Sequence, residues 1–479
     1  MPARPAVLPP VPARLPRVER AGSRRRAPDA LVITADTELD EGWLAAEEPT
    51  GKAGEIRVVA TPAGPRWLVG VGERRPADWR TAGAALVRAV AERELTTLDL
   101  GFSAEPQATE VESLVLGLVL GGYRFGLSAE RPAVTPRVVK LRVDADLTEA
   151  IDRAVVLAGA TALARDLANM PSNVKNPAWL ATTAARVAGA VPGLAATVRD
   201  ENWLAEQGFG GLLAVGGGSV SPPRLLELTW RPPAARTHLA LVGKGITFDT
   251  GGLSLKPAAG MHLMRTDMAG GAAVIGAVRG IAQLGLPVAV TALVAMAENH
   301  VSGSAYRPGD VVRHYGGTTT EVGNTDAEGR MVLADALAYA VAAHRPDLIV
   351  DAATLTGAMK ISLGVRTGGL FATDDQLAAR IGAAGDGVGE AWWRMPLTEA
   401  YTESVHGEVA DLRQYSPNND PGAIFAALFL REFTGGLPWA HLDIAGPARA
   451  DASYAEVTAG ATGFAARTLV GLAESLARD

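Results

Sequence analysis

The order of apolar and polar positions predicts that the first third of the chain alternates between strands and helices. Short runs rich in Val, Ile and Leu predict strands, and alanine-rich segments with apolar residues at helical spacing predict helices. The expected strands are 31–34, 56–60, 66–71, 97–100 and 138–143, and the expected helices are 78–93 and 110–121. This alternation predicts a small α/β domain over residues 29–145.

A longer helical pattern follows this domain. Apolar residues recur at helical spacing from Asp144 to Leu167 and predict one long helix, with Leu147, Ile151, Val155, Ala158 and Ala162 on its apolar side. We therefore expect residues 146–168 to form a helix that links the first domain to a larger domain at 169–479.

Strands and helices alternate again in the larger domain. The expected strands are 224–230, 238–243, 288–296, 347–352 and 438–443, and the expected helices are 177–190, 268–284, 328–343, 375–384 and 422–434. Such alternation is typical of a mostly parallel central sheet flanked by helices. In sheets of this kind, ligands bind at the carboxyl ends of the strands.

Residues 1–28 differ from both domains, because they are rich in proline and arginine. This composition predicts a flexible or loosely docked arm. The alternative is a basic tail that touches nucleic acid or a membrane surface. The segment lacks the continuous apolar stretch of a secretion signal, and we expect a cytoplasmic protein.

The composition narrows the class of protein. A chain of 479 residues favours two domains, and its 48% of hydrophobic residues can fill two cores. The formal net charge of −7 argues against a dedicated nucleic-acid binder, which would usually be basic. No apolar run reaches the roughly 18–20 residues of a membrane span.

The residue types also limit the chemistry. The chain has no cysteine, which excludes disulfides, thiolate metal sites and a cysteine nucleophile. Its seven histidines form no His-Glu-x-x-His motif. Any metal site is then expected to be rich in carboxylates, which suits magnesium, manganese or zinc. The glycine-rich stretches complete no nucleotide-binding motif, and no Gly-x-Ser-x-Gly motif of a serine hydrolase is present.

The heptapeptide Asn-Thr-Asp-Ala-Glu-Gly-Arg at 324–330 is the strongest local candidate for chemistry. Asp326 and Glu328 stand two residues apart, immediately before an apolar run that predicts a helix. Carboxylates at a helix N-terminus lie in a favourable field and can converge on a divalent cation. The alternative is an ordinary capped helix start.

Further charged residues lie upstream in apolar or glycine-rich surroundings, at Lys244, Asp249, Lys256 and Asp267. Lys244 stands between two glycines directly after a predicted strand. An amine ligates a metal only when it is neutral, and two adjacent dications with partial burial would depress its pKa enough. The alternative is that Lys244 pairs with the carboxylates as an ammonium group.

These motifs resemble the leucyl aminopeptidase family, the two-metal cytosol aminopeptidases. The heptapeptide is similar to the family signature without a substitution. Further matching segments follow in the family's order at 164–173, 216–219, 298–299, 307–310, 353–358 and 439–447. The resemblance covers roughly residues 160–479, so that the larger domain is expected to be the catalytic one and the first domain the family's variable N-terminal domain.

The resemblance implies a role for each candidate. Asp249 and Glu328 would bridge two metal ions, Lys244 and Asp267 would complete the shell of one ion, and Asp326 that of the other. Lys256 would stay charged and donate a hydrogen bond to the developing oxyanion. Arg330 would hold a bicarbonate ion that acts as general base. Met264, Thr354 and Gly357 match positions that line the pocket for the N-terminal side chain, with core packing as the alternative.

The function implied is a metal-dependent exopeptidase that removes leucine or other apolar residues from peptides with a free N-terminus. The resemblance also implies two divalent ions per subunit, manganese or zinc with magnesium as a further option, and a homohexamer. Two other classes remain open from the residues. One is a DNA-binding or regulatory protein on the same fold, and the other is an α/β ligand-binding protein without catalysis.

Overall fold

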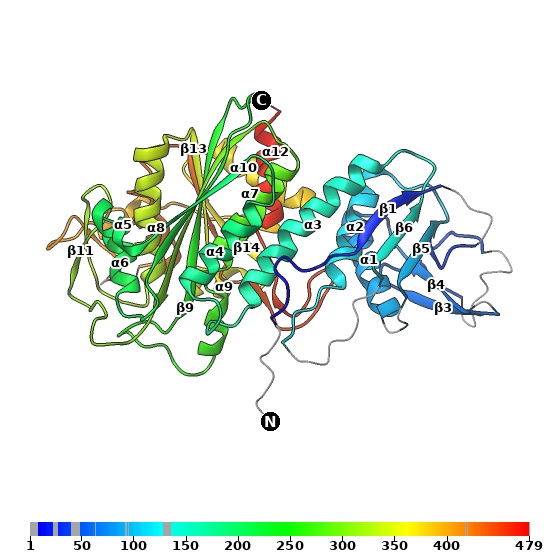
Figure 1. Cartoon of the computed structure of the whole chain (residues 1–479), viewed down its shortest axis with the longest axis horizontal. Coiled ribbons are helices and arrows are strands. Elements are labelled where there is room, and N and C mark those ends of the chain that lie inside the picture. Colours follow the sequence, from blue (N-terminus) through cyan, green and yellow to red (C-terminus); the bar gives the residue numbers. More distant parts are fainter. Residues whose placement is uncertain are drawn as a thin grey trace. The chain divides into compact units, whose positions relative to one another are not determined.

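The computed structural model of the chain describes residues 8–22, 27–39, 48–62, 64–91, 93, 95–127, 136–416, 418 and 420–478. The chain divides into two compact units (Figure 1). Unit 1 comprises Met1–Ala162 with Ala450–Gly460, and unit 2 comprises Leu163–Arg449 with Ala461–Asp479. The boundary between the units falls inside one long helix, α3 (Thr148–Asn169). In the described part of the chain, no helix is both long and apolar enough to cross a membrane.

Unit 1 is built on a six-stranded sheet in the order β1-β6-β5-β2-β4-β3. All neighbouring strands run parallel except β3 and β4, which are antiparallel. Its strands and helices are β1 (Arg17–Ala21), β2 (Ala30–Ile33), β3 (Ile56–Thr61), β4 (Gly64–Gly70), β5 (Thr97–Phe102), β6 (Val138–Arg142), α1 (Pro76–Ala91) and α2 (Ala108–Gly121). The predicted small α/β domain is confirmed.

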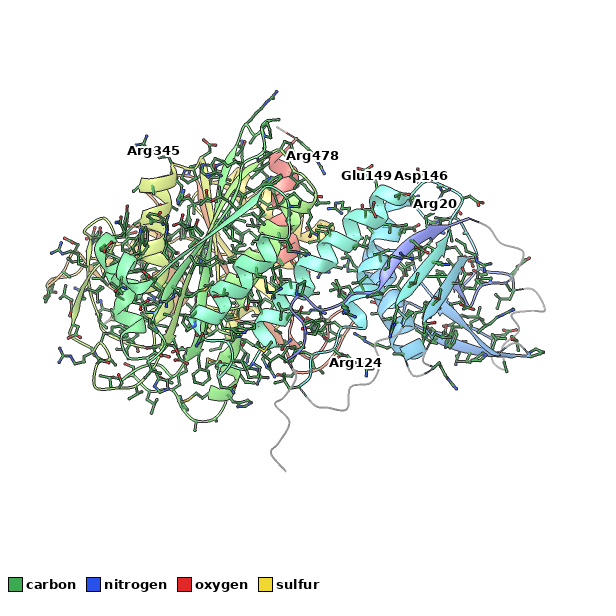
Figure 2. All side chains as sticks on the ribbon, in the orientation of Figure 1. Arg20, Arg124, Asp146, Glu149, Arg345 and Arg478 are labelled. Atoms are coloured by element: carbon green, nitrogen blue, oxygen red, sulfur yellow. The ribbon has the colours of Figure 1, made fainter. Side chains whose placement is uncertain are left out.

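The prediction of a flexible arm over 1–28 is wrong for Arg17–Ala21. This segment is the edge strand β1, which pairs in parallel with β6 and buries Val18. Arg20, labelled in Figure 2, donates from Nη2 to the carbonyl of Asp144 at 2.6 Å. An edge strand pairs with its neighbour through main-chain hydrogen bonds. A segment rich in arginine can therefore still form an edge strand. The rest of the predicted arm includes residues 1–7 and 23–26, which lie outside the described residues.

A short return segment near the C-terminus belongs to unit 1, although the sequence pattern assigned all of 169–479 to one domain. Arg80 lies 3.6 Å from Glu456, with both side chains at most 10% exposed. Arg88 donates to the carbonyl of Val457 at 3.2 Å. The segment lacks a strand or helix pattern of its own, and for this reason its place could not be predicted.

Unit 2 is built on an eight-stranded sheet in the order β15-β14-β17-β13-β9-β10-β8-β7. The four central strands are parallel, and antiparallel pairs occur toward both edges, which confirms the predicted mostly parallel sheet. The strands are β7 (Leu194–Arg199), β8 (Arg224–Trp230), β9 (His238–Asp249), β10 (Ala289–Asn299), β13 (Leu348–Ala353), β14 (Thr367–Ala372), β15 (Ala391–Arg394) and β17 (Trp439–Asp443).

Helices flank this sheet, with α5, α6 and α8 on one side and α4, α7 and α12 on the other (Figure 1). The helices of unit 2 besides α3 are α4 (Pro177–Ala188), α5 (Glu201–Gln207), α6 (Gly210–Gly216), α7 (Ala269–Gln283), α8 (Glu328–Tyr339), α9 (Gly357–Leu363), α10 (Asp375–Val388), α11 (Gly422–Arg431) and α12 (Ala466–Leu476). A continuous apolar core joins α6, α8 and α11 to the sheet.

The chain also contains shorter elements. A three-stranded sheet in unit 2 contains β11 (Val311–Arg313), β12 (Thr319–Glu321) and β16 (Leu412–Arg413). A two-stranded sheet contains β18 (Arg449–Ala450) and β19 (Gly460–Ala461), which include the two ends of the return segment Ala450–Gly460. Short helical turns lie at η2 (Met261–Thr266), η3 (Ala340–His344), η4 (Glu399–Tyr401) and η5 (Glu403–Val405).

The two central strands β9 and β10 extend further than the sequence predicted. β9 continues to Asp249 and β10 to Asn299, and these two residues are partners in the parallel pairing. A register shift between Ala297 and Glu298 accompanies the extension. The extension places Lys244 within β9, where the sequence pattern had placed it just after the strand.

Helix α7 packs closely against the sheet at Gly270, which has no side chain. A Cβ atom on Gly270 would lie 2.0 Å from the carbonyl oxygen of Ala352, at the end of β13. We therefore predict that Gly270→Ala destabilises the protein by about 1–3 kcal/mol, the usual range for overpacking of a tight interior contact. Urea denaturation of the purified variant measures the change.

Gly382→Ala in α10 is the matched control, because no atom lies within 4 Å of a Cβ placed there. We expect this variant to be as stable as the parent or more stable by about 0.5–1 kcal/mol, since alanine is favoured over glycine in a helix. Equal destabilisation by both substitutions would contradict the packing argument.

Candidate functional site

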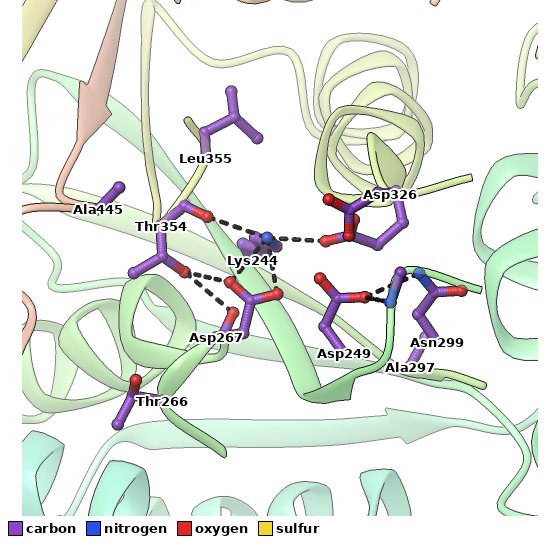
Figure 3. A network of polar contacts seen from close by, with 12 residues as sticks. Lys244, Asp249, Thr266, Asp267, Ala297, Asn299, Asp326, Thr354, Leu355 and Ala445 are labelled. Carbon is purple, nitrogen blue, oxygen red and sulfur yellow. Dashed lines mark hydrogen bonds and ion pairs between the residues drawn. The ribbon is translucent and has the colours of Figure 1, made fainter. Parts of the chain in front are cut away.

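The predicted acidic residues meet at the carboxyl end of the parallel strands in unit 2 (Figure 3). Asp249 ends β9, Asp267 lies between η2 and α7, and Asp326 and Glu328 lie at the start of α8. One carboxylate oxygen each from Asp249, Asp326 and Glu328 lies within 4.8 Å of the other two. Asp249 and Glu328 are each 1% exposed, and Asp267 is also buried. The fold thus gathers four carboxylates that are as many as 79 residues apart in sequence, from position 249 to position 328.

Lys244 lies on β9 between two of these carboxylates. Its Nζ is 2.8 Å from oxygens of Asp267 and 2.8 Å from Glu328 Oε1, and it donates to the carbonyl of Thr354 at 3.0 Å. Burial would lower the pKa of Lys244, but the charges of Asp267 and Glu328 outweigh burial and hold the pKa above its ordinary value. Without a metal ion, Lys244 therefore pairs with the carboxylates as an ammonium group, which is the alternative given in the sequence analysis. A neutral amine at the same position would face an ion held by these carboxylates.

Lys256 occupies the other side of the cluster. Its Nζ lies 2.8 Å from Asp249 Oδ2 and 2.5 Å from Asp326 Oδ1. Its side chain is 21% exposed, compared with 3% for Lys244. Burial opposes the charge of Lys256, but Asp249 and Glu328 outweigh it and raise the pKa of the amine. Lys256 is therefore the lysine that solvent reaches more easily.

Asn299 positions Asp249, a role that the sequence analysis did not assign. Its side-chain amide donates to Asp249 Oδ1 at 2.8 Å and to the carbonyl of Thr325 at 3.0 Å. The N–H of Gly251 donates to the same Asp249 oxygen at 2.8 Å. Asn299 thereby ties the end of β9 to the heptapeptide. The position of Asn299 could have indicated this role, because Asn299 ends β10 and is the pairing partner of Asp249 at the end of β9.

Burial, followed by the charge of Glu328, raises the pKa of Asp249 to about 6, although Lys256 and Lys244 act in the opposite direction. Burial likewise raises the pKa of Asp267 and that of Glu328. These carboxyl groups hold their protons more tightly than exposed ones because burial and mutual repulsion disfavour their charge.

Thr354, one of the residues predicted to line the pocket for the N-terminal side chain, contacts the cluster. Its Oγ1 donates to Asp267 Oδ1 at 2.7 Å, and its carbonyl accepts from Lys244. The turn that carries it is held by Asp443, whose carboxylate accepts from the N–H groups of Leu355 and Thr356 at 3.2 and 3.1 Å. Asp443 is 1% exposed. This support was missed, because Asp443 acts on main-chain groups 87 residues or more away in sequence.

The other two predicted pocket residues take different places. Met264 lies in η2, where its carbonyl accepts from the N–H of Asp267 at 3.1 Å. Gly357 begins α9 and is exposed, with open space where a Cβ would stand. The structure therefore brings Thr354 into contact with the cluster, and it places Met264 on the turn that leads to Asp267.

Arg330 is buried in the first turn of α8. Its Nη1 donates to the carbonyl of Gln414 at 2.6 Å, and its guanidinium lies 5.7 Å from the ring centroid of Phe425. Its buried Nε has no hydrogen-bond partner among the described residues. Burial lowers the pKa of Arg330 to about 10, which leaves the group charged at neutral pH. A buried guanidinium with a free N–H suits an anion.

Gln414 holds the heptapeptide from its other side and was also missed by the sequence analysis. Its side-chain oxygen accepts from the N–H groups of Gly323 and Asn324, each at 3.0 Å, and its Nε2 donates to the carbonyl of Ala327 at 3.2 Å. Gln414 is fully buried. No motif surrounds it in the sequence, so that its contacts could be found only in the structure.

The residues of the cluster fit divalent cations. Asp249, Asp267, Asp326 and Glu328 carry four negative charges against the two positive charges of Lys244 and Lys256, a formal surplus of two. Three buried carboxylate oxygens, Asp267 Oδ2, Asp326 Oδ1 and Glu328 Oε1, have no partner among the described residues except the lysine amines that lie within 2.8 Å of them. A buried surplus of charge is costly unless a cation neutralises it, and carboxylate oxygens suit hard dications.

Known proteins resemble this chain over most of its length. The model of the cytosol aminopeptidase family, catalytic domain, matches residues 162–470, and that of the family's N-terminal domain matches 34–127. A protein of Corynebacterium efficiens named "Probable cytosol aminopeptidase" is 44% identical over 444 residues, which are 89% of this chain and 86% of that protein. One of Roseiflexus castenholzii with the same name is 44% identical and covers 88% of this chain and 90% of its own length.

A solved structure is similar across both units. The bottromycin maturation enzyme BotP, in complex with Mn, superposes with a TM-score of 0.86 at 40% sequence identity. The match covers 94% of this chain and 100% of that one. These comparisons confirm the family that the sequence motifs indicated.

The raised pKa of Asp249 generates a prediction for metal binding. Its carboxyl group takes up a proton as the pH falls through about 6, and a metal ion must displace that proton. We predict that the affinity for Mn²⁺ weakens as the pH falls, because Lys244 must lose a proton to serve as a ligand, and that below pH 6 the proton on Asp249 adds about a further tenfold loss per pH unit. Calorimetric titration at a series of pH values measures it. An affinity that stays constant from pH 7 to pH 5 would contradict this prediction.

Proposed function

This chain belongs to the cytosol aminopeptidase family, and on this premise we propose that it removes N-terminal leucine or other apolar residues from peptides by means of two divalent metal ions. Membership of the family implies metal-dependent hydrolysis at peptide N-termini. The observation that carries the two-metal proposal is the cluster of four carboxylates, three of them buried. Two dications bring four positive charges, which equal the four negative charges of the carboxylates. Lys244 would be neutral as a ligand, and Lys256 would remain as one further positive charge.

Five residues would hold the ions, in the roles that the family resemblance implies. Asp249 and Glu328 would bridge the pair, Lys244 and Asp267 would complete one shell, and Asp326 the other. Manganese or zinc suits this donor set, with magnesium as a further option. When bound, such a pair supplies an activated water and polarises the scissile carbonyl. The BotP structure was solved with Mn, which supports manganese as the first ion to test.

Lys256 would act on the substrate directly. Its ammonium is held at the edge of the cluster by Asp249 and Asp326, and part of its side chain is exposed. A fixed cation at this place would donate a hydrogen bond to the oxygen that becomes negative as the peptide bond is attacked. The resulting stabilisation is larger in the transition state than in the bound substrate, and it therefore increases kcat.

Arg330 would hold a bicarbonate ion as the general base. The buried guanidinium and its free Nε support an anion at this position. The base would accept the proton of the attacking water, a role that needs a group within hydrogen-bond reach of that water. The contacts of Gln414 with Arg330 and the heptapeptide would keep this anion in place.

We propose short peptides with a free N-terminus as substrates. Thr354, with Met264 and Gly357, would border the pocket for the N-terminal side chain. The proposal includes a homohexamer, which the family resemblance implies, and a cytoplasmic location, which the names of the cytosol aminopeptidase relatives support.

The first test is peptidase activity. We predict that the protein loaded with Mn²⁺ or Zn²⁺ cleaves leucine p-nitroanilide and leucine-containing dipeptides, and that a chelator abolishes cleavage until metal is restored. A peptide with an acetylated N-terminus serves as the control and should not be cleaved. Failure of the metal-loaded protein on the whole dipeptide panel would reject the enzymatic proposal.

The second test separates Lys256 from Glu328. Glu328→Ala removes a carboxylate of the cluster, so that metal content and activity should fall together. Lys256→Ala removes the proposed oxyanion donor and its positive charge but no proposed metal ligand. We predict that metal content remains while kcat falls by about 10²–10³ with a much smaller change in KM. Metal analysis and steady-state kinetics on both variants measure these quantities.

A Lys256→Ala variant that loses its metal, while the metal-loaded fraction keeps full activity, would show that Lys256 is a ligand or a structural residue. The proposed division of roles between the two lysines would then be wrong.

A further inference from the structure

Two side chains between α3 and α4 reach the segments that carry the metal-site residues. The hydroxyl of Ser172 donates to the carbonyl of Thr247 at 2.8 Å. The Nζ of Lys175 donates to the carbonyl of Arg265 at 2.6 Å and to that of Ala168, near the end of α3, at 3.0 Å. Ser172 belongs to the segment 164–173 that the sequence analysis matched to the family, and Lys175 follows two residues after that segment. The proposed function leaves both residues without a role.

The stretch between the two helices is itself held rigidly. The N–H groups of Val174 and Lys175 both donate to the carbonyl of Pro171, at 3.0 and 2.9 Å. Asn176 then caps α4 through its side chain, which accepts from the N–H of Trp179 at 2.8 Å. Ser172 and Lys175 thus project from a fixed turn between two helices.

Lys175 is an unusual lysine because it is 0% exposed and pairs with no carboxylate among the described residues. Burial and the charge of Arg265 hold the pKa of Lys175 well below its ordinary value. A neutral amine still carries two N–H groups, which match the two carbonyl acceptors. The two hydrogen bonds therefore do not require a charged lysine.

The two carbonyl acceptors outside α3 lie close in sequence to the metal-site residues. Thr247 stands on β9 between Lys244 and Asp249. Arg265 lies in η2, two residues before Asp267, in the turn closed by the hydrogen bond from Asp267 N–H to the Met264 carbonyl. One rigid turn therefore contacts both segments whose side chains meet at the Lys244–Asp267 ion pair.

We propose that Ser172 and Lys175 are positioning residues for the metal site, which fix β9 and the η2 turn relative to each other. This inference rests on the proposed function, since it concerns the site that would hold the ions. Residues that orient metal ligands typically change metal affinity or activity by about 10–100-fold when they are removed. Ser172 and Lys175 both donate to main-chain carbonyls, so that their effect on the metal-site side chains is transmitted through the backbone of β9 and η2.

The test compares Lys175→Met and Ser172→Ala with the parent protein. Calorimetric titration with Mn²⁺ measures the dissociation constant, and hydrogen–deuterium exchange of the metal-free protein measures local opening of residues 261–267. For Lys175→Met we expect the dissociation constant to increase by about 10–100-fold and exchange in 261–267 to accelerate. Ser172→Ala should show a smaller increase, because it loses one hydrogen bond instead of two.

Thr161→Val is the matched control. Its buried hydroxyl donates to the carbonyl of Leu157 within α3 at 3.2 Å, and the substitution removes a similar bond without reaching the site. We expect this variant to bind Mn²⁺ like the parent. Equal weakening of binding by Thr161→Val would mean that general destabilisation causes the effect and would overturn the proposal.

The outcomes separate this inference from the proposed function. A parent protein that binds Mn²⁺, together with a folded Lys175→Met variant of unchanged affinity and exchange, would overturn the inference alone. A parent protein that binds no Mn²⁺ would reject the proposed function, whereas the exchange measurement would still decide whether Lys175 holds the η2 turn. If Lys175→Met does not fold, Ser172→Ala decides the inference, and an unchanged affinity in that variant would overturn it.

Discussion

The mutual repulsion of four carboxylates at one end of a sheet is the constraint on which the rest of unit 2 depends. Such groups stay together only if opposite charges, hydrogen-bond donors and a rigid framework compensate their repulsion. The framework is the parallel centre of the sheet, which brings the ends of β9, β10 and β13 to one edge. Lys244 and Lys256 supply opposite charge, and Asn299 and the N–H of Gly251 supply donors to Asp249. The remaining surplus of two negative charges is what suits the cluster to a cation.

The two lysines share this compensation but differ in their surroundings. Lys244 comes from within a central strand and is enclosed between Asp267 and Glu328, and its amine has these two carboxylates and the carbonyl of Thr354 as its polar partners among the described residues. Lys256 comes from the loop after β9 and keeps part of its side chain exposed. An enclosed amine suits a ligand, whereas a partly exposed cation suits contact with a substrate that arrives from solvent. The difference in burial therefore supports the same division of roles that the family resemblance implies.

The sequence predicted the parts of the structure that depend on local pattern. The central strands of unit 2, the helix that begins at Glu328 and the acidic residues of the site all follow from periodicity or from short motifs. The edge strand β1 and the return segment at Ala450–Gly460 could not be predicted, because main-chain pairing and long-range contacts place them. Gln414, Asp443 and Lys175 were missed for a related reason. Each one holds main-chain groups far away in sequence, and such contacts leave no local signal.

These missed residues have a common physical role. Gln414 holds the heptapeptide, Asp443 holds the turn of Thr354, and Lys175 holds the turn before Asp267. None of these contacts adds a charge next to the carboxylates, so that the side chains of the site remain available to an ion. A further cationic group beside the carboxylates, in addition to Lys244 and Lys256, would compete with that ion, whereas a contact to the backbone fixes position without competing. The fold therefore separates the residues that make the charge of the site from the residues that hold it in place.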